Sequence, residues 1–181
     1  HYAMDKLSDS EKRGRPDILH FCMLEAMGSP LNRRGQLRLW ANTLHGYNIE
    51  VSPTTRPPRD CIRFNSLMEQ LFANGRVPPK SKEPLMKLDK ASLKDLIKRS
   101  SPSKVIALSS HGEASNFPDV AKLLSDEESP MVLIGAYPKG PMKTETLDLA
   151  GEVYSVYPES LEAWTITSRI VYEYEQAIGL I

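Results

Sequence analysis

Arginine side chains gather around a predicted helix start in segment 55–64. Asp60 can cap this helix or occupy its first turn. The apolar residues then recur at helical spacing until Asn74-Gly75 ends the helix. Guanidinium groups bind phosphate through paired hydrogen bonds, and the positive end of a helix dipole adds to their charge. The pattern therefore predicts a phosphate-binding surface formed by Arg56, Arg59 and Arg63. The alternative is a solvated helix face with ordinary ion pairs.

Charge is distributed unevenly along the chain. Its 181 residues hold 23 basic and 23 acidic side chains, yet segments 1–52, 53–104 and 105–181 carry net charges of +1, +7 and −8. The central segment has 12 basic and 5 acidic residues. This asymmetry favours a polyanionic partner such as nucleic acid, with the acidic C-terminal segment kept away from that contact.

Composition places the chain among ordinary globular proteins, with 40% hydrophobic and 25% charged residues. No apolar run has the length of a membrane span and no signal peptide opens the chain, so we expect a cytoplasmic protein, or a nucleolar one in a eukaryote. Cys22 and Cys61 lack CxxC spacing, and the histidines lack paired ligand spacing. We therefore expect reduced thiols and no metal site.

The elements that must position the arginines are predicted in the first half of the chain. A helix starts at Arg15-Pro16-Asp17 and stops at Gly28-Ser29-Pro30. Segments 36–44 and 47–52 read as a β-hairpin turning at His45-Gly46. Segment 85–88 reads as a short strand, and 92–99 as a basic helix that Ser92 caps.

The second half of the chain alternates short apolar strands with small or polar loops. The strands are predicted at 105–108, 131–134 and 152–156, before a final helix at 161–179. With helices between them, they favour a mostly parallel sheet whose strand-end loops meet at one pocket. The chain lacks GxGxxG, GxxxxGK[ST], GxSxG and HExxH motifs. The glycine-containing loops are either a nucleotide-like cofactor site or simple turns.

Six motifs in register resemble one family. They are 13–20 (RGRPDILH), 29–32 (SPLN), 55–59 (TRPPR), 63–71 (RF with LMEQL), 134–140 (IGAYPKG) and 155–164. Together they are similar to the pseudouridine-N1-specific rRNA methyltransferases of ribosome biogenesis, of the SPOUT class, and most similar to the archaeal members. The match spans nearly the whole chain.

The resemblance implies an α/β fold with a mostly parallel sheet, helices on both faces, a deep C-terminal trefoil knot and a small β-hairpin extension. It implies a single domain over 1–181, the hairpin extension within 30–58 and a knotted cofactor-binding part over 104–181. Family members begin with a strand before the position of Tyr2-Ala3-Met4, so we expect that strand to be missing here.

The resemblance also implies S-adenosyl-L-methionine as cofactor, a homodimer, and small-subunit rRNA as partner, with ribosomal assembly factors or small-subunit proteins as further partners and no membrane. It assigns RNA contacts to Arg56, Arg59 and Arg63. The expected cofactor-binding residues are Leu108, Ser109, Gly112, Ile134, Gly135, Ala136, Gly140, Tyr154, Val156, Tyr157, Leu161 and Trp164. Lys139 stands where the family commonly has histidine, so no proton-transfer role is carried over to it.

Arg15 and Asp17 match a family pair near the target base and are the expected catalytic residues. When the N1 proton of pseudouridine leaves, negative charge spreads to the carbonyl oxygens, where a guanidinium stabilises it. Asp17 either orients Arg15, the role we favour, or accepts the proton. The alternative for Asp17 is a purely structural salt bridge at a helix start.

Two other functions fit the same arginines. One is a ribosome-assembly factor that binds RNA without catalysis, and the other is a SPOUT enzyme acting on tRNA or on unmodified uridine. Cofactor binding separates the enzymes from the assembly factor.

Overall fold

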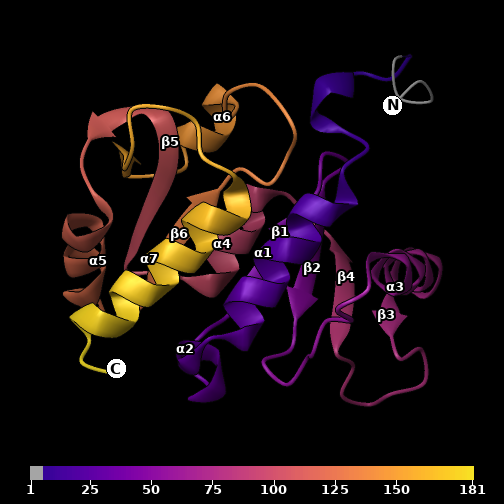
Figure 1. Cartoon of the computed structure of the whole chain (residues 1–181). Coiled ribbons are helices and arrows are strands. Elements are labelled where there is room, and N and C mark those ends of the chain that lie inside the picture. Colours follow the sequence, from indigo (N-terminus) through magenta and orange to yellow (C-terminus); the bar gives the residue numbers. More distant parts are fainter. Residues whose placement is uncertain (1–5) are drawn as a thin grey trace. The chain divides into compact units, whose positions relative to one another are not determined.

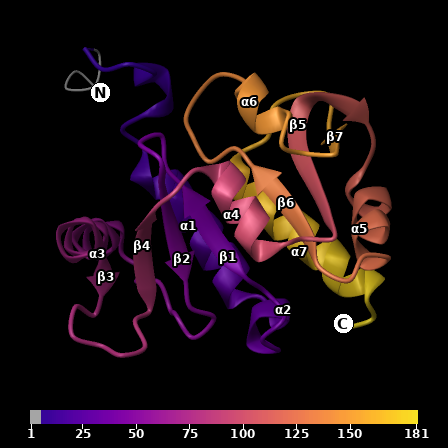
Figure 2. The same ribbon diagram turned by 180° about the vertical axis from the view of Figure 1, so that it is seen from behind.

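The computed structural model describes residues 6–181 (Figures 1 and 2). The chain forms two compact units. The parallel-sheet unit comprises the described residues up to Cys22 together with Pro102–Ile181, and the antiparallel-sheet unit comprises Met23–Ser101. Tyr2-Ala3-Met4, before which the family's first strand is expected, lie outside the described residues. Within residues 6–181, no helix combines the length and the apolar character needed to cross a membrane.

Three parallel strands form the centre of the parallel-sheet unit. They are β5 (Lys104–Ala114), β6 (Pro130–Ile134) and β7 (Glu152–Ser155), in the order β6-β5-β7. Helices α5 (Phe117–Ser125) and α7 (Ala163–Ala177) share a hydrophobic core with the sheet (Figure 1). The predicted α/β fold with a parallel sheet is confirmed, and the knot stays a prediction.

Strand β5 continues well past the predicted strand end at Leu108. Its pairing with β7 shifts register, so that Leu108 and Glu113 both align with Tyr154. Residues 109–112 therefore form a bulge that is anchored at both ends, where the sequence predicted a free loop. Gly112 permits this close approach, because a Cβ there would lie 2.6 Å from the Tyr154 carbonyl carbon.

The antiparallel-sheet unit contains a four-stranded sheet in the order β1-β2-β4-β3. Its strands are β1 (Leu39–Asn42), β2 (Tyr47–Val51), β3 (Arg76–Val77) and β4 (Met86–Lys90). The predicted hairpin is present with a shorter first strand, and the predicted strand near 85–88 is β4. Because β4 pairs with both β2 and β3, the hairpin belongs to a larger antiparallel sheet.

Local capping signals explain where the helices begin and end. Helix α3 (Cys61–Asn74) starts at Asp60, whose side chain accepts a hydrogen bond from the Arg63 amide, and stops at Gly75 in the left-handed region. In α4 (Leu93–Ser100), Ser92 and Asp95 form a reciprocal capping box. The predicted caps of both helices are confirmed.

The N-terminal part of the described chain contains three short or medium helices. They are η1 (Ser10–Lys12), α1 (Pro16–Gly28) and α2 (Pro30–Arg33). Helix α1 starts at the predicted proline. Ser29 then accepts a hydrogen bond from the Asn32 amide, so a new turn begins directly after the predicted stop. The remaining helix, α6 (Thr144–Leu147), lies between β6 and β7.

Candidate functional site

A pocket of about 250 Å³ lies in the parallel-sheet unit, where β6 and β7 end and β5 bulges. Residues from four segments far apart in the sequence line it, three of them at the carboxyl ends of the strands, where a parallel sheet places a ligand site. Seven of the predicted cofactor-binding residues lie in its wall: Leu108, Ser109, Gly135, Gly140, Val156, Tyr157 and Leu161.

The other five predicted cofactor residues lie outside the pocket wall. Ile134 and Tyr154 pack against the hydrophobic core, and Gly112 lies against the backbone of β7. Trp164 is half-buried, with its ring edge-on to Phe21 at 5.2 Å between centroids. Ala136 is exposed between two residues that line the pocket.

Sequence reasoning missed several apolar residues that complete the wall. Ile18 comes from α1, Met142 follows the β6 loop, and Ala163 and Ile166 belong to α7. The sequence offered a signal for Ile18, because this residue directly follows the predicted catalytic residue Asp17 in the motif 13–20. Lys139, which stands where the family commonly has histidine, also lines the pocket and is exposed.

The loop after β6 is held by the segment that precedes α1. The Lys12 ammonium donates a hydrogen bond to the Pro141 carbonyl at 2.7 Å and lies 4.6 Å from the centre of the Tyr137 ring. Lys143 pairs with Asp9 at 2.8 Å. Burial raises the pKa of Tyr137, so its hydroxyl stays protonated in the pocket wall. These contacts fix one side of the pocket.

Arg15 and Asp17 form a two-pronged ion pair at the start of α1. Arg15 Nε donates to Asp17 Oδ1 at 2.9 Å, and Nη2 donates to Oδ2 at 2.7 Å. The hydrogen bond raises the pKa of Arg15 and lowers the pKa of Asp17, and the charge of Glu162 in the pocket wall also raises the pKa of Arg15. The pair is therefore charged at neutral pH and lies near the pocket.

The geometry of this pair bears on the role of Asp17. A carboxylate whose two oxygens both accept from one guanidinium, and whose pKa is lowered, is a weak proton acceptor. It holds the guanidinium plane in a fixed orientation. The arrangement supports the orienting role over proton abstraction.

Side chains of the neighbouring strands β5 and β7 are linked by hydrogen bonds and an ion pair. Tyr154 Oη donates to Glu152 at 2.6 Å, and Lys104 Nζ lies 3.1 Å from the same carboxylate. The hydrogen bond to Glu152 and desolvation raise the pKa of Tyr154 to about 12. Ser155, the last residue of β7, and Val156, which follows it, line the pocket.

The three predicted RNA-binding arginines lie in the antiparallel-sheet unit around the start of α3. Thr55 is buried and donates to the Leu85 carbonyl at 2.8 Å, which fixes the segment that carries them. Arg56 donates to the carbonyls of Pro53 and Thr55. Arg59 and Arg63 are exposed.

No ion pair involves Arg56, Arg59 or Arg63 in the part of the chain that the structure describes. The alternative reading of the sequence, a solvated helix face with ordinary ion pairs, expects such partners. The exposed guanidinium groups of Arg59 and Arg63 lie at a helix N-terminus, where an external anion is favoured.

Comparisons with known proteins agree on one family. The family described as EMG1/NEP1 methyltransferase matches residues 1–175. "Ribosomal RNA small subunit methyltransferase Nep1" of Staphylothermus marinus is 38% identical over 181 residues, covering 100% of this chain and 78% of that protein. The protein of the same name from Pyrobaculum calidifontis is 40% identical over 182 residues, covering 100% and 80%.

A solved structure agrees with the sequence comparisons. The crystal structure of Archaeoglobus fulgidus Nep1 bound to S-adenosylhomocysteine matches with a TM-score of 0.82 and 33% identity, covering 98% of this chain and 77% of that one. The family predicted from six motifs is confirmed, and the chain belongs to the EMG1/NEP1 methyltransferase family.

Proposed function

We propose that this protein transfers a methyl group from S-adenosyl-L-methionine to N1 of a pseudouridine in small-subunit rRNA. The observation that carries the proposal is the pocket at the carboxyl ends of the parallel strands, with the Arg15–Asp17 pair at the start of the helix that supplies Ile18 to its wall. The names of the relatives support the rRNA substrate, and the bound S-adenosylhomocysteine of the Archaeoglobus protein supports the methyl donor.

The pocket has features that suit this cofactor. Leu108, Leu161 and Ile166 provide apolar wall, and serine and glutamate side chains provide hydrogen-bond partners. Gly135 lines the pocket without a side chain, and a Cβ there would lie 2.9 Å from the Tyr137 ring. We propose that these residues hold S-adenosylmethionine, which supplies an electrophilic methyl group when bound.

The residues of the chain then act on the base. Pseudouridine has a ring N1–H that uridine lacks, and methylation forms a bond from N1 to carbon as the N1 proton leaves. Holding the unstacked base in line with the methyl group supplies most of the acceleration. Arg15 stabilises the negative charge that develops on the carbonyl oxygens, and Asp17 keeps the guanidinium in its plane.

We propose that Arg56, Arg59 and Arg63 contact RNA. None of the three side chains forms an ion pair within residues 6–181, so an RNA phosphate has no carboxylate to displace.

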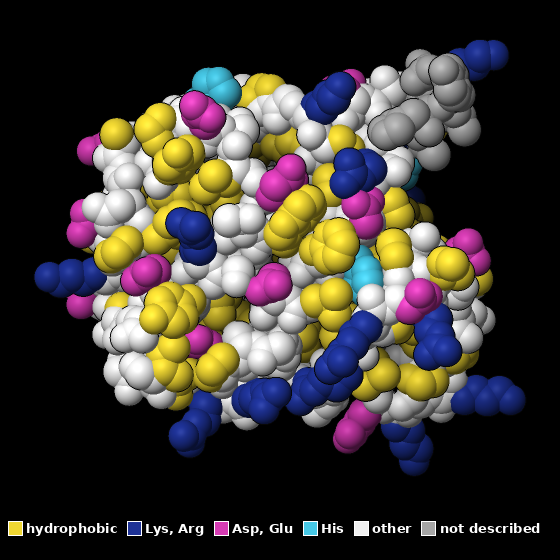
Figure 3. All heavy atoms as spheres, in the orientation of Figure 1, with side chains coloured by type: hydrophobic (Ala, Val, Ile, Leu, Met, Phe, Trp, Pro, Cys, Tyr) yellow, Lys and Arg dark blue, Asp and Glu magenta, His cyan; other side chains and the backbone are white. Residues whose placement is uncertain are grey.

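We also propose a homodimer. Phe21 and Tyr172 are 42% and 52% exposed, and hydrophobic side chains reach the surface over α1 and α7 in Figure 3. Such apolar surface suits a subunit contact.

A binding experiment tests this function against the assembly-factor alternative. Calorimetry with S-adenosylmethionine and S-adenosylhomocysteine should give saturable binding, and donor carrying a labelled methyl group should label small-subunit rRNA. RNA binding without cofactor binding would support the assembly factor and contradict the enzyme.

A further inference from the structure

The four-stranded sheet has one face that is aromatic and charged. The strand register aligns Trp40 with Glu50, Glu50 with Lys87, and Lys87 with Arg76. Because side chains alternate along a strand, these four residues point to the same face. The neighbouring residues Ile49, Val51 and Met86 are buried and belong to the opposite face.

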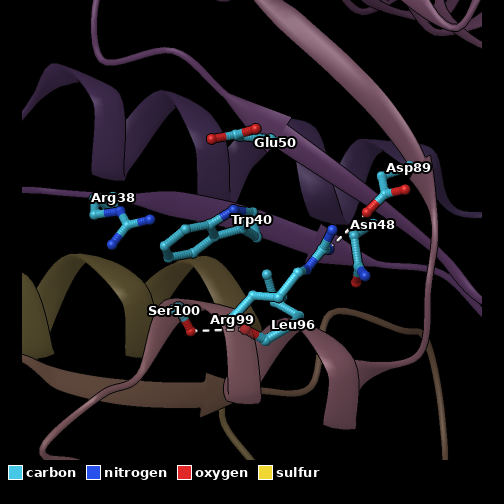
Figure 4. Close-up of a pocket in the computed structure, with 8 residues that line it drawn as sticks. All are labelled: Arg38, Trp40, Asn48, Glu50, Asp89, Leu96, Arg99 and Ser100. Atoms are coloured by element: carbon cyan, nitrogen blue, oxygen red, sulfur yellow. Dashed lines mark hydrogen bonds and ion pairs between the residues drawn. The ribbon is translucent and has the colours of Figure 1, made fainter.

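A pocket of about 150 Å³ opens on this face beside the Trp40 indole (Figure 4). The guanidinium carbon of Arg38 lies 4.5 Å from the centre of the Trp40 ring. On the other side of the pocket, Arg99 from α4 places Nη2 2.6 Å from Asp89 Oδ2. A half-buried aromatic face is thus bordered by two arginines.

The floor of this pocket is preformed. Asn48 is buried, donates to the Ala91 carbonyl at 2.9 Å and accepts from Asn42 at 2.7 Å. These bonds fix the orientation of the Asn48 amide. Glu50, in contrast, is exposed and forms no ion pair in the part of the chain described, although it aligns with Lys87. One carboxylate therefore remains available to a ligand.

These groups match the chemistry of an unpaired nucleobase. Bases stack on aromatic side chains exposed on a four-stranded antiparallel sheet, and stacking tolerates every base. An exposed cation–π contact is weaker than such stacking, so a base can displace the Arg38 guanidinium from the Trp40 ring. Arg38, Arg76 and Lys87 then lie within the same face to meet phosphates, and the Glu50 carboxylate accepts from exocyclic amino groups.

We propose that Trp40 and Glu50 form a base-stacking subsite that holds an unpaired nucleotide of the RNA substrate, outside the methyl-transfer pocket. The proposal rests on the proposed function for the identity of RNA as the ligand. The carboxylate of Glu50 makes the subsite prefer cytosine or adenine, which carry exocyclic amino groups, over uracil.

Fluorescence titration with short single-stranded ribooligonucleotides tests the subsite. Binding should quench Trp40 emission in the wild-type protein, and Trp40→Phe should lose this quenching while its affinity stays within about threefold, because phenylalanine still stacks. Trp40→Leu keeps apolar bulk without a stacking face and should weaken binding roughly 5- to 100-fold. Its logarithmic salt slope should equal that of the wild type, since stacking releases no counterions.

Glu50→Gln is the matched test of base preference and should reduce the discrimination between cytosine-rich and uracil-rich oligonucleotides. Circular dichroism melting establishes that each variant is folded. A folded Trp40→Leu protein with wild-type RNA affinity, or wild-type binding without tryptophan quenching, would overturn the subsite. Those results would contradict the subsite alone and would not bear on methyl transfer to rRNA. Absence of cofactor binding in the wild-type protein would instead contradict the proposed function.

Discussion

Asp17 holds the Arg15 guanidinium through two of its nitrogen atoms, with Nε 2.9 Å from Oδ1 and Nη2 2.7 Å from Oδ2. The side chains are 40% and 25% exposed, so the pair is accessible to a bound base. An exposed ion pair adds little to folding stability. We propose that its fixed plane orients the guanidinium towards the base in the reaction.

Substitution of Arg15 should slow the chemical step. Arg15→Lys keeps one charge and loses the planar fork, so single-turnover methylation should fall by about 100-fold, and Arg15→Ala should fall further. Calorimetry should show unchanged cofactor affinity in both variants. A folded Arg15→Lys protein with the wild-type rate at saturating RNA would restrict Arg15 to binding or structure.

Asp17→Asn separates an orienting residue from a general base. Asparagine still accepts one hydrogen bond from Arg15, so an orienting Asp17 predicts a loss of roughly tenfold in single-turnover rate with an unchanged shape of the pH–rate profile. If Asp17 were the base, the substitution would abolish the rate or remove the acidic limb of the profile.

Arg59→Ala and Arg63→Ala should weaken RNA binding and reduce its salt dependence. Each lost phosphate contact lowers the magnitude of the logarithmic salt slope by about 0.7 to 0.9. Lys122→Ala, an exposed basic residue of the acidic C-terminal segment, serves as the control and should keep the wild-type slope. Equal salt slopes in the wild type and all three variants would support the alternative, a solvated helix face with no phosphate contacts.

The arginine helix was predictable because its signals are local. Asp60 and Gly75 cap α3 through contacts within a few residues, and Ser92 with Asp95 does the same for α4. Such patterns are visible in sequence without tertiary information.

The bulge of β5 and the fixation of the pocket loop were not predictable in the same way. Residues 109–114 are mostly polar and small, and they become a strand only because they pair again with β7. Lys12 donates to the carbonyl of Pro141, which is 129 residues away in the sequence, and no local sequence pattern predicts such a contact. Likewise, the antiparallel sheet depends on β4, which joins strands distant in sequence.

Gly135→Val should abolish cofactor binding while the protein remains folded. The new side chain either occupies the pocket or displaces the Tyr137 ring, whose nearest atoms lie 2.9 Å from the position of a Cβ. Gly151→Val is the matched control, because its Cβ would meet the nearest atom at 3.6 Å and the residue does not line the pocket. Normal S-adenosylmethionine affinity in a folded Gly135→Val protein would show that the pocket assignment is wrong.

High pH should remove the stabilisation that the Tyr154–Glu152 hydrogen bond provides. Because the pKa of Tyr154 is raised to about 12 in the folded chain, this contribution is complete below the ordinary tyrosine pKa of about 10 and is lost as the pH rises towards 12. The difference in melting temperature between wild type and Glu152→Gln should shrink over that interval. Phenolate absorbance, compared with Tyr154→Phe, should show Tyr154 ionising at lower pH in Glu152→Gln, and an unchanged titration would refute the assignment.

Locating the methyl group in a modified RNA tests the central claim most directly. Short small-subunit rRNA hairpins that carry either uridine or pseudouridine at the same position are incubated with the protein and S-adenosylmethionine, and the products are mapped by mass spectrometry. We expect one added methyl group on the pseudouridine ring and none on the uridine hairpin, because only pseudouridine presents N1–H. Equal methylation of both hairpins, or methylation on ribose, would contradict N1-specific transfer.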